Sequence, residues 1–325
     1  MSMVQPKVSV IIPVYGVEKY IARCARSLFG QTLQNIEYIF VNDCTPDNSI
    51  KILCEVLEQY PQRKEQVQII NLPYNMGAAK AREVGIKAAK GEYIIHCDSD
   101  DWVMIDAYQK MYDCSNKYGY DILIADYVEH NGKDVIRQVH QELGDNPLST
   151  IISKPVLCSL FNKLVRRSVI GYDIYYPTNH MQEDNVLCIQ MFYYANSIGY
   201  LREQNPVYAY YINPNSISHE VGESAHIKRW SQAMANTQIA CRFAKDKGFY
   251  KQYEKEFLSL KFNVRGFLMP LMKQNNRYWK RWISCFPELN WRIFELKNIS
   301  LSLKVIFIMT LLGLYPLINK IRTKK

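Results

Sequence analysis

The chain runs Tyr93-Ile94-Ile95-His96-Cys97-Asp98-Ser99-Asp100-Asp101-Trp102, an apolar segment followed at once by a cluster of carboxylates. An apolar segment this short suits a buried strand better than a helix. Aspartate is depleted inside strands, so the cluster marks the point where the strand ends and a loop begins. In an open α/β sheet, ligands bind in the crevice beyond the carboxyl ends of the strands. The simplest alternative is a polar turn in which Asp100 or Asp101 caps the next helix.

The charge of this cluster also points to a cation. Carboxylates this close together repel one another unless a cation or a set of hydrogen-bond donors offsets the repulsion. Clustered hard oxygen ligands suit Mg²⁺ or Mn²⁺, and either ion can also bridge phosphate oxygens. The cluster therefore predicts a Mn²⁺ or Mg²⁺ cofactor at the edge of a sheet.

Strand and helix patterns alternate through the first half of the chain, which predicts an α/β fold. The sheet should be mostly parallel, with helices on both faces. Strands are predicted over residues 8–12, 36–41, 67–72, 93–97 and 121–125, and helices over 17–28, 50–60, 78–90 and 106–118. Pro13 should end the first strand, and Gly91 should follow the third helix.

The alternation weakens beyond residue 128. Residues 128–146 resemble a polar hairpin, 161–170 and 184–196 have helical patterns, and 207–212 is strand-like. From residue 226 onward the pattern is helical. We therefore expect an α/β domain over 1–218 and a helical C-terminal region over 219–325, with the first domain divided into halves at 127/128.

Composition narrows the class of protein. The 325 residues carry a net charge of +9, but the basic residues form no stripe with interleaved aromatics, which argues against nucleic acid as a partner. The nine cysteines contain no C-x-x-C pair, as expected in a reducing compartment. The first residues lack a signal-peptide pattern, so we expect a cytoplasmic protein.

The C-terminal region suggests contact with a membrane. Residues 305–318 are almost entirely apolar and are flanked by lysine and arginine, with no acidic residue after Glu295. Fourteen residues fall short of the ~20 that cross a bilayer as a helix. A segment of this kind suits the interface of an anionic membrane, which places the protein at the inner face of the cell membrane. The alternative is a helix packed on the rest of the chain.

Three further loops follow predicted strands and should open on the same edge as the acidic cluster. They offer Tyr15 to stack on a base, Asp43 to accept from a ring N–H, and Arg82 to face a diphosphate. A helix N-terminus near Gly77 favours phosphate binding. Each residue also has a plainer interpretation: Tyr15 as core, Asp43 as a turn cap, Arg82 as a surface ion pair worth under ~1 kcal/mol. Together they indicate a nucleoside diphosphate site.

The order of these motifs resembles the family 2 glycosyltransferases, inverting enzymes with the Rossmann-like GT-A fold. The resemblance is close over residues 7–127 and looser to about 218. One departure is Cys44-Thr45, where family members usually have Gly-Ser. The motifs are Val8-Ser9-Val10-Ile11-Ile12-Pro13-Val14-Tyr15, Val41-Asn42-Asp43, Asp47-Asn48-Ser49, Asn75-Met76-Gly77, Ala81-Arg82 and Asp98-Ser99-Asp100-Asp101.

The resemblance implies roles for individual residues. Asp43 would bind the base, Asp98 the ribose and the metal side, and Asp100 the metal as its principal ligand. Asp101 remains a candidate helix cap. The residues implied in nucleotide-sugar binding are Pro13, Tyr15, Asp43, Asn75, Gly77, Arg82, Asp98 and Ser99.

Two residues in the second half look like the pair that supplies the catalytic base in this family. Asp184 is the better candidate and Glu183 is its neighbour, although Asp184 could also simply cap the helix. His219 is a candidate to complete the metal shell. Asn162-Lys163-Leu164 resembles another element of the family, near the acceptor side.

These features predict a metal-dependent, inverting glycosyltransferase. Its donor would be a nucleotide sugar, most simply a UDP-sugar, and its acceptor a saccharide or a lipid-linked hydroxyl in surface polysaccharide synthesis. One alternative is transfer to a polyprenyl phosphate. Another is a catalytically silent, membrane-associated assembly subunit, although such a subunit would be free to lose Asp98, Asp100 and Asp184.

Overall fold

The alternating segments fold into a sheet covered by helices, in a computed structural model that describes residues 5–171, 173–202, 206–213, 222–272, 277–296 and 299–322. The strands are β1 (Val8–Val14), β2 (Ile36–Asn42), β3 (Val67–Asn71), β4 (Tyr93–His96), β5 (Trp102–Val103), β6 (Ile122–Ala125), β7 (Tyr127–His130), β8 (Val135–Val139), β9 (Lys163–Arg166), β10 (Ile198–Leu201) and β11 (Tyr208–Tyr211). The helices are α1 (Ile21–Phe29), α2 (Ser49–Leu57), α3 (Ala78–Ala88), α4 (Ala107–Tyr118), α5 (Pro147–Ser153), α6 (Glu183–Tyr194), α7 (Glu223–Asp246), α8 (Glu254–Gly266), α9 (Met269–Met272), α10 (Trp279–Ser284), α11 (Leu289–Arg292), α12 (Leu301–Leu311) and α13 (Tyr315–Arg322).

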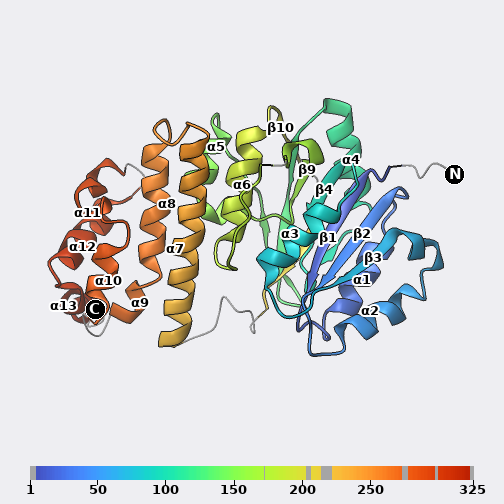
Figure 1. The fold of residues 1–325 in the computed structure, drawn as a ribbon, viewed down its shortest axis with the longest axis horizontal. Helices are drawn as coiled ribbons and strands as arrows, with labels where there is room; N and C mark the ends of the chain where they lie inside the picture. Colours follow the sequence, from blue (N-terminus) through green and yellow to red (C-terminus); the bar gives the residue numbers. More distant parts are fainter. Residues whose placement is uncertain are drawn as a thin grey trace.

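The described strands pair into a seven-stranded sheet of order β10-β6-β9-β4-β1-β2-β3. Pairing is parallel throughout except at β9, which lies antiparallel to both β4 and β6. Both faces of the sheet are buried. Along β1, Val10 and Ile12 pack with α1, α2 and α4, whereas Ile11 packs on the other face with α3 and α6. The expected α/β fold with helices on both faces is confirmed (Figure 1).

Two predictions about strands were wrong. Pro13 lies inside β1 rather than ending it, because the pairing with β4 stops at Ile11 and the missing N–H interrupts no ladder on that side. Residues 161–170 were predicted to be helical, but Lys163–Arg166 forms β9. Its Leu164 and Val165 face opposite sides of the buried sheet, and a short apolar run of this kind does not reveal its period.

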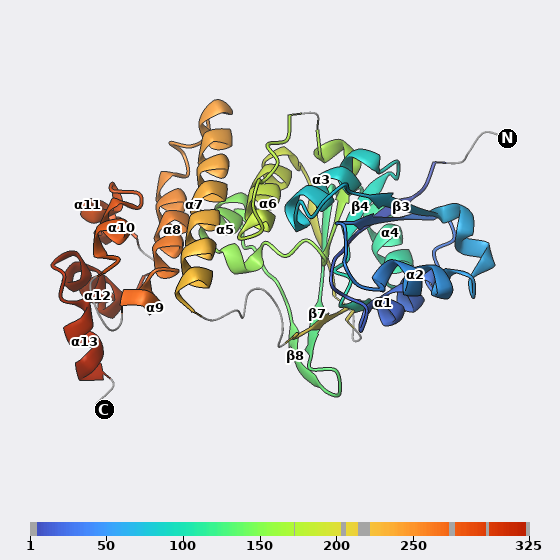
Figure 2. The same cartoon turned by 60° about the horizontal axis from the view of Figure 1, so that its bottom comes forward.

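A second, four-stranded sheet of order β5-β11-β7-β8 lies beside the acidic cluster in the described structure. Its β7–β8 hairpin, expected from the polar pattern after residue 128, extends away from the body of the molecule (Figure 2). Asp101 connects the acidic cluster to β11: its carboxylate accepts from the Tyr208 hydroxyl at 2.6 Å and from the Tyr211 N–H at 2.7 Å. The Tyr208 oxygen also accepts from the Asp98 N–H at 3.1 Å.

Asp101 therefore does not cap a helix, which corrects the expectation from sequence. Helix α4 begins only at Ala107, and no side chain caps it. Asp101 is fully buried, and burial is the main cause that raises its pKa well above the usual value. The negative charges of Asp98 and Asp100 raise this pKa further. The two donors from β11 compensate part of this cost.

The C-terminal helical extension is confirmed, and it has two parts. Helices α7 and α8 pack beside α5 and α6 and share their core, and α9–α13 continue away from the sheet (Figure 1). The outer helices have a separate core that includes Trp282, Phe307 and Tyr315. Among the described helices, none combines the length and the apolar character needed to cross a bilayer.

We expect Tyr208→Phe to destabilise the fold, because it removes the donor to buried Asp101 and the acceptor of the Asp98 N–H. An unsatisfied buried polar group costs about 1–3 kcal/mol. Urea denaturation should show a lower midpoint with an unchanged slope. Tyr74→Phe, at a tyrosine that is 61% exposed, should leave the midpoint in place. Equal midpoints for parent and Tyr208→Phe would show that this connection does not stabilise the protein.

Candidate active site

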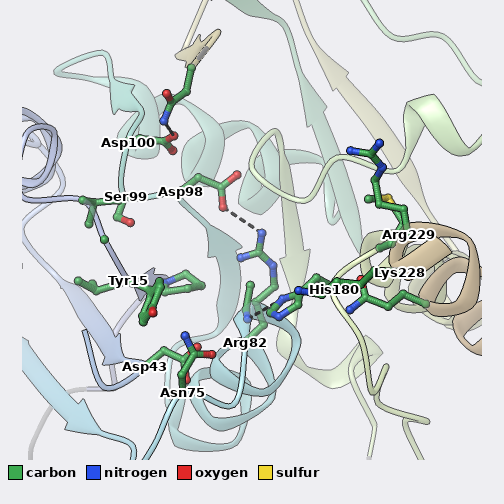
Figure 3. A pocket seen from close by; sticks show the side chains of 18 of the residues that line it. Tyr15, Asp43, Asn75, Arg82, Asp98, Ser99, Asp100, His180, Lys228 and Arg229 are labelled. Atoms are coloured by element: carbon green, nitrogen blue, oxygen red, sulfur yellow. Dashed lines mark hydrogen bonds and ion pairs between the residues drawn. The ribbon is translucent and has the colours of Figure 1, made fainter. Parts of the chain in front are cut away.

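A cavity of about 670 Å³ opens at the carboxyl ends of the central strands (Figure 3). Its volume is in the range of small-molecule sites. Tyr15 is 45% exposed at its wall, so it is not a core residue. Gly77 lies beside the cavity, under His180, rather than among the residues that line it. The predicted residues that line the cavity are Pro13, Tyr15, Asp43, Asn75, Arg82, Asp98, Ser99 and Asp100.

Asp43 holds the loop between β3 and α3. Its two carboxylate oxygens accept from the Met76 N–H at 2.6 Å and the Gly77 N–H at 2.7 Å, and the residue is 3% exposed. The plain interpretation of Asp43 as a turn-holding carboxylate is therefore correct. Each oxygen has a second lone pair, so contact with a base is compatible with this arrangement and stays a prediction.

The loop after Asp43 explains the departure at Cys44-Thr45. Cys44 has a φ of 55°, in the left-handed region that glycine adopts without cost. Thr45 stabilises the turn, since its hydroxyl donates to Asp47 at 2.7 Å and accepts from the Gly16 N–H at 2.9 Å. Cys44 therefore holds a backbone conformation that is strained for a residue other than glycine.

Arg82 connects the acidic cluster to the predicted base. Its Nη2 lies 2.9 Å from Asp98 Oδ1, and its Nε lies 3.7 Å from Asp184 Oδ1. Burial alone would lower the pKa of the guanidinium, but the charges of Asp98 and Asp184 raise it above its usual value. The Nε and Nη1 atoms are buried and make no hydrogen bond within the described structure. The guanidinium is thus charged, and Arg82 is among the residues that line the cavity.

Asp98 and Asp100 suit a divalent cation. Burial raises the pKa of Asp100, and the charge of Asp98 raises it further, which is the like-charge conflict that a cation relieves. Asn213 donates to Asp100 Oδ2 at 3.1 Å. The described residues contain no group of three His, Cys, Asp or Glu side chains arranged around a metal. A cation here would need further ligands such as phosphate oxygens. His219 lies outside the described residues.

Glu183 and Asp184 occupy the first turn of α6, where the helix dipole favours negative charge. Burial raises the pKa of both carboxyls: Glu183 is raised further by Asp184, whereas Arg82 opposes the rise at Asp184. The residue before them, Gln182, has a left-handed φ of 63°. Neither carboxyl lines the cavity, but Arg82 joins Asp184 to it.

Helix α7 fixes the segment that leads into this pair. Asn236, which is fully buried, donates from its side-chain nitrogen to the carbonyls of Asn179 at 2.8 Å and Met181 at 2.9 Å. Its oxygen accepts from the Thr178 N–H at 3.3 Å. The position of the predicted base therefore depends on the helical region beyond residue 218.

Several residues that line the cavity were missed by the sequence analysis. His180 precedes the carboxyl pair, and exposed Lys228 and buried Arg229 come from α7 (Figure 3). None of these three residues belongs to a motif at the end of a strand. They reach the cavity because α7 packs against residues 178–182. The sole signal in the sequence was a local pairing of basic residues, Lys228-Arg229, within a helical pattern.

Comparison with known proteins places these observations in context. The sequence model of glycosyl transferase family 2 matches residues 9–198. EpsH of Bacillus subtilis (strain 168), a glycosyltransferase by name, is 30% identical over 266 residues, which are 78% of this chain and 74% of EpsH. The poly(ribitol-phosphate) beta-N-acetylglucosaminyltransferase TarS of Staphylococcus aureus is 28% identical over 209 residues, 62% of this chain and 35% of TarS.

Two solved structures have the same fold. The crystal structure of S. aureus TarS 1-349 in complex with UDP-GlcNAc matches with a TM-score of 0.56 and 19% identity, over 89% of this chain and 92% of that one. The mannosyltransferase PcManGT from Pyrobaculum calidifontis, in complex with GDP-Man and Mn²⁺, matches with a TM-score of 0.55 and 12% identity, over 99% and 89%. The fold is therefore GT-A, with a helical C-terminal region.

The raised pKa of Glu183 predicts a pH-dependent effect of Glu183→Gln. The folded state holds the Glu183 proton at a higher pH than the unfolded chain does, so ionisation destabilises the folded state as pH rises. We expect Glu183→Gln to be more stable than the parent at pH 8.5, by about 1 kcal/mol or more, with a smaller gain near pH 5. Urea denaturation across this range measures the difference. Glu55→Gln, at an exposed site, should show no such trend, and a constant offset for Glu183→Gln would contradict the prediction.

Proposed function

Since the chain belongs to glycosyl transferase family 2, we propose that it is an inverting enzyme that transfers a sugar from a nucleotide diphosphate donor to an acceptor hydroxyl. The donor would be a UDP-sugar and the acceptor a saccharide or lipid-linked glycan of a surface polymer. The similarity to TarS, a poly(ribitol-phosphate) beta-N-acetylglucosaminyltransferase by name, supports a polymer of this class. A solved neighbour with UDP-GlcNAc supports the choice of donor nucleotide.

The observation that carries the proposal is the contact of Arg82 with both Asp98 and Asp184. A cation that lines the cavity suits the diphosphate that leaves the sugar, because it stabilises the charge that develops there. A carboxylate held next to this cation, on a different element, suits a general base. An inverting displacement needs these two functions on opposite sides of the anomeric carbon.

In this mechanism Asp184 accepts the proton of the acceptor hydroxyl. The acceptor oxygen forms its bond to the anomeric carbon while the bond from that carbon to the diphosphate oxygen breaks. Arg82 faces the diphosphate oxygens. Tyr15 and Asp43 hold the nucleobase of the donor at the far end of the cavity. The raised pKa of Asp184 matches its role, since a stronger base accepts a proton more readily near neutral pH.

The residues present fit a divalent cation, and Asp98 and Asp100 would hold Mn²⁺ or Mg²⁺ together with the donor diphosphate. Such an ion supplies charge neutralisation for the leaving group. The raised pKa of Asp100, caused by burial and by the charge of Asp98, supports this assignment. A structural neighbour that contains GDP-Man and Mn²⁺ supports a metal in this fold.

We expect Asp184→Asn to abolish transfer while nucleotide binding persists, because the amide keeps the shape of the side chain but takes up no proton. Loss of a general base lowers the rate by about 10²–10⁴-fold. The comparison variant Asp100→Ala should lose the Mn²⁺-dependent part of UDP binding. Transfer is measured with a panel of nucleotide sugars, and the anomeric configuration of the product by NMR. A retained configuration, or a parent-like rate for Asp184→Asn, would refute the mechanism.

We also propose that the outer helices bind the surface of an anionic membrane at the cytoplasmic face. Large apolar side chains of α11–α13 and the turn between α11 and α12 are exposed, which defines the C-terminal apolar surface. Trp291 is 88% exposed and Phe294 is 64% exposed. The members of this surface are Trp291, Phe294, Leu301, Leu303, Val305, Leu312, Leu314 and Leu317.

The charges around this surface support an anionic lipid partner. Exposed Lys280 and Arg281 lie on α10, and the Lys304 ammonium reaches the Phe294 carbonyl at 3.3 Å. Beyond residue 257 the acidic residues are Glu288 and Glu295, each in an ion pair. An apolar surface with cationic neighbours suits the interface of such a membrane. Phe307 and Tyr315 pack inward, so α12 and α13 also stabilise the fold.

We expect the double variant Trp291→Ala/Phe294→Ala to lose binding to vesicles that contain phosphatidylglycerol. These side chains are exposed, so their removal leaves the outer core intact. Co-sedimentation should show several-fold less bound protein, and binding by the parent should weaken as salt rises. Tyr118→Ala, at a tyrosine 58% exposed elsewhere, is the control. Equal binding of all three proteins would remove the membrane proposal.

A further inference from the structure

His180 lies between the segment that carries Glu183 and Asp184 and the N-terminus of α3 at the cavity. Its Nδ1 accepts from the Ala78 N–H at 3.1 Å, in the first turn of α3, and its ring is among the groups that line the cavity. We propose that His180 is a binding residue that donates a hydrogen bond from Nε2–H to the diphosphate of the donor. This inference rests on the function proposed above.

The contact with Ala78 determines which ring nitrogen carries the proton. An acceptor nitrogen holds no proton, so a neutral imidazole bonded in this way is protonated at Nε2. Burial lowers the pKa of His180. The charge of Asp43, the next largest cause, opposes this, and the smaller effects of Lys228 and Arg82 lower the pKa further, so the ring is neutral at pH 7. Within the described residues, Nε2 has no hydrogen-bond partner and is not buried, which leaves its N–H available to a ligand.

The ring is held rigidly in this position. It lies over Gly77, where a Cβ would come within 2.1 Å of the imidazole Cε1, so only glycine permits this approach. On the other side, Asn236 bonds the backbone at 178, 179 and 181, the residues that flank His180. A hydrogen-bonding side chain that is held on both sides loses little conformational entropy when a ligand binds.

The groups around His180 indicate the charge of that ligand. Figure 3 shows the imidazole beside Arg82, on the side from which Lys228 of α7 approaches. Two cations and a neutral N–H at the N-terminus of α3 suit a multiply charged oxyanion. The diphosphate is the part of a nucleotide sugar with that chemistry. His180 would therefore connect donor binding to the segment that carries Glu183 and Asp184.

Two substitutions separate this role from a structural one. In His180→Asn the amide oxygen takes the place of Nδ1 and can still accept from the Ala78 N–H, but no N–H reaches the position of Nε2. In His180→Gln the amide nitrogen extends toward the position of Nε2. Isothermal titration with UDP in Mn²⁺ should show about tenfold or greater loss of affinity for His180→Asn and a smaller loss for His180→Gln. Thermal unfolding without ligand should change little for His180→Asn.

The control is His140→Asn, at a histidine whose side chain is 55% exposed and pairs with Asp126 away from the cavity. Its UDP affinity should equal that of the parent. If His180→Asn binds UDP within twofold of the parent, His180 is structural and the inference is wrong. If the parent binds neither UDP nor GDP, the proposed function itself fails, and the assignment of His180 fails with it.

Discussion

The buried guanidinium of Arg82 is the interaction on which the site depends. Three acidic residues come close to it from two distant parts of the chain, and its positive charge offsets their negative charge. Removal of one partner from a buried charge group typically costs about 3–5 kcal/mol. The helix that carries Arg82 begins at the loop held by Asp43. The carboxylate that orders this loop and the cation that balances the acidic cluster are therefore positioned by the same short segment.

The helical region beyond residue 218 completes this arrangement. Asn236 fixes the turn before the carboxyl pair, and Lys228 and Arg229 bring positive charge to the cavity wall. The match to the family model ends at residue 198, before α7 begins. A site described from the sheet alone would omit the groups that hold the segment of Glu183 and Asp184 in place.

The strand ends were predictable from sequence because the spacing of apolar residues and the composition of a loop are local properties of the chain. Apolar runs that end in Asp98 or Asp43 show both the strand and its edge, and parallel pairing then brings the loops together. The antiparallel strand β9 was not predictable, since Leu164 and Val165 are buried on opposite faces and leave no period to detect. Asp101 and His180 depend on partners more than a hundred residues away in sequence, Tyr208 and Ala78 respectively. No local pattern encodes such contacts.

The position of β9 has a consequence for how the molecule can move. This strand follows residue 127 in the chain, yet it lies inside the sheet between β4 and β6, which both precede that residue. Separation of residues 5–127 from the residues that follow would break the pairing of β9 with both β4 and β6. The two parts of the chain are therefore joined through the sheet itself, and motion around the cavity is left to the loops at its rim. A fragment that ended near residue 127 would leave a gap within its own sheet rather than a shortened edge.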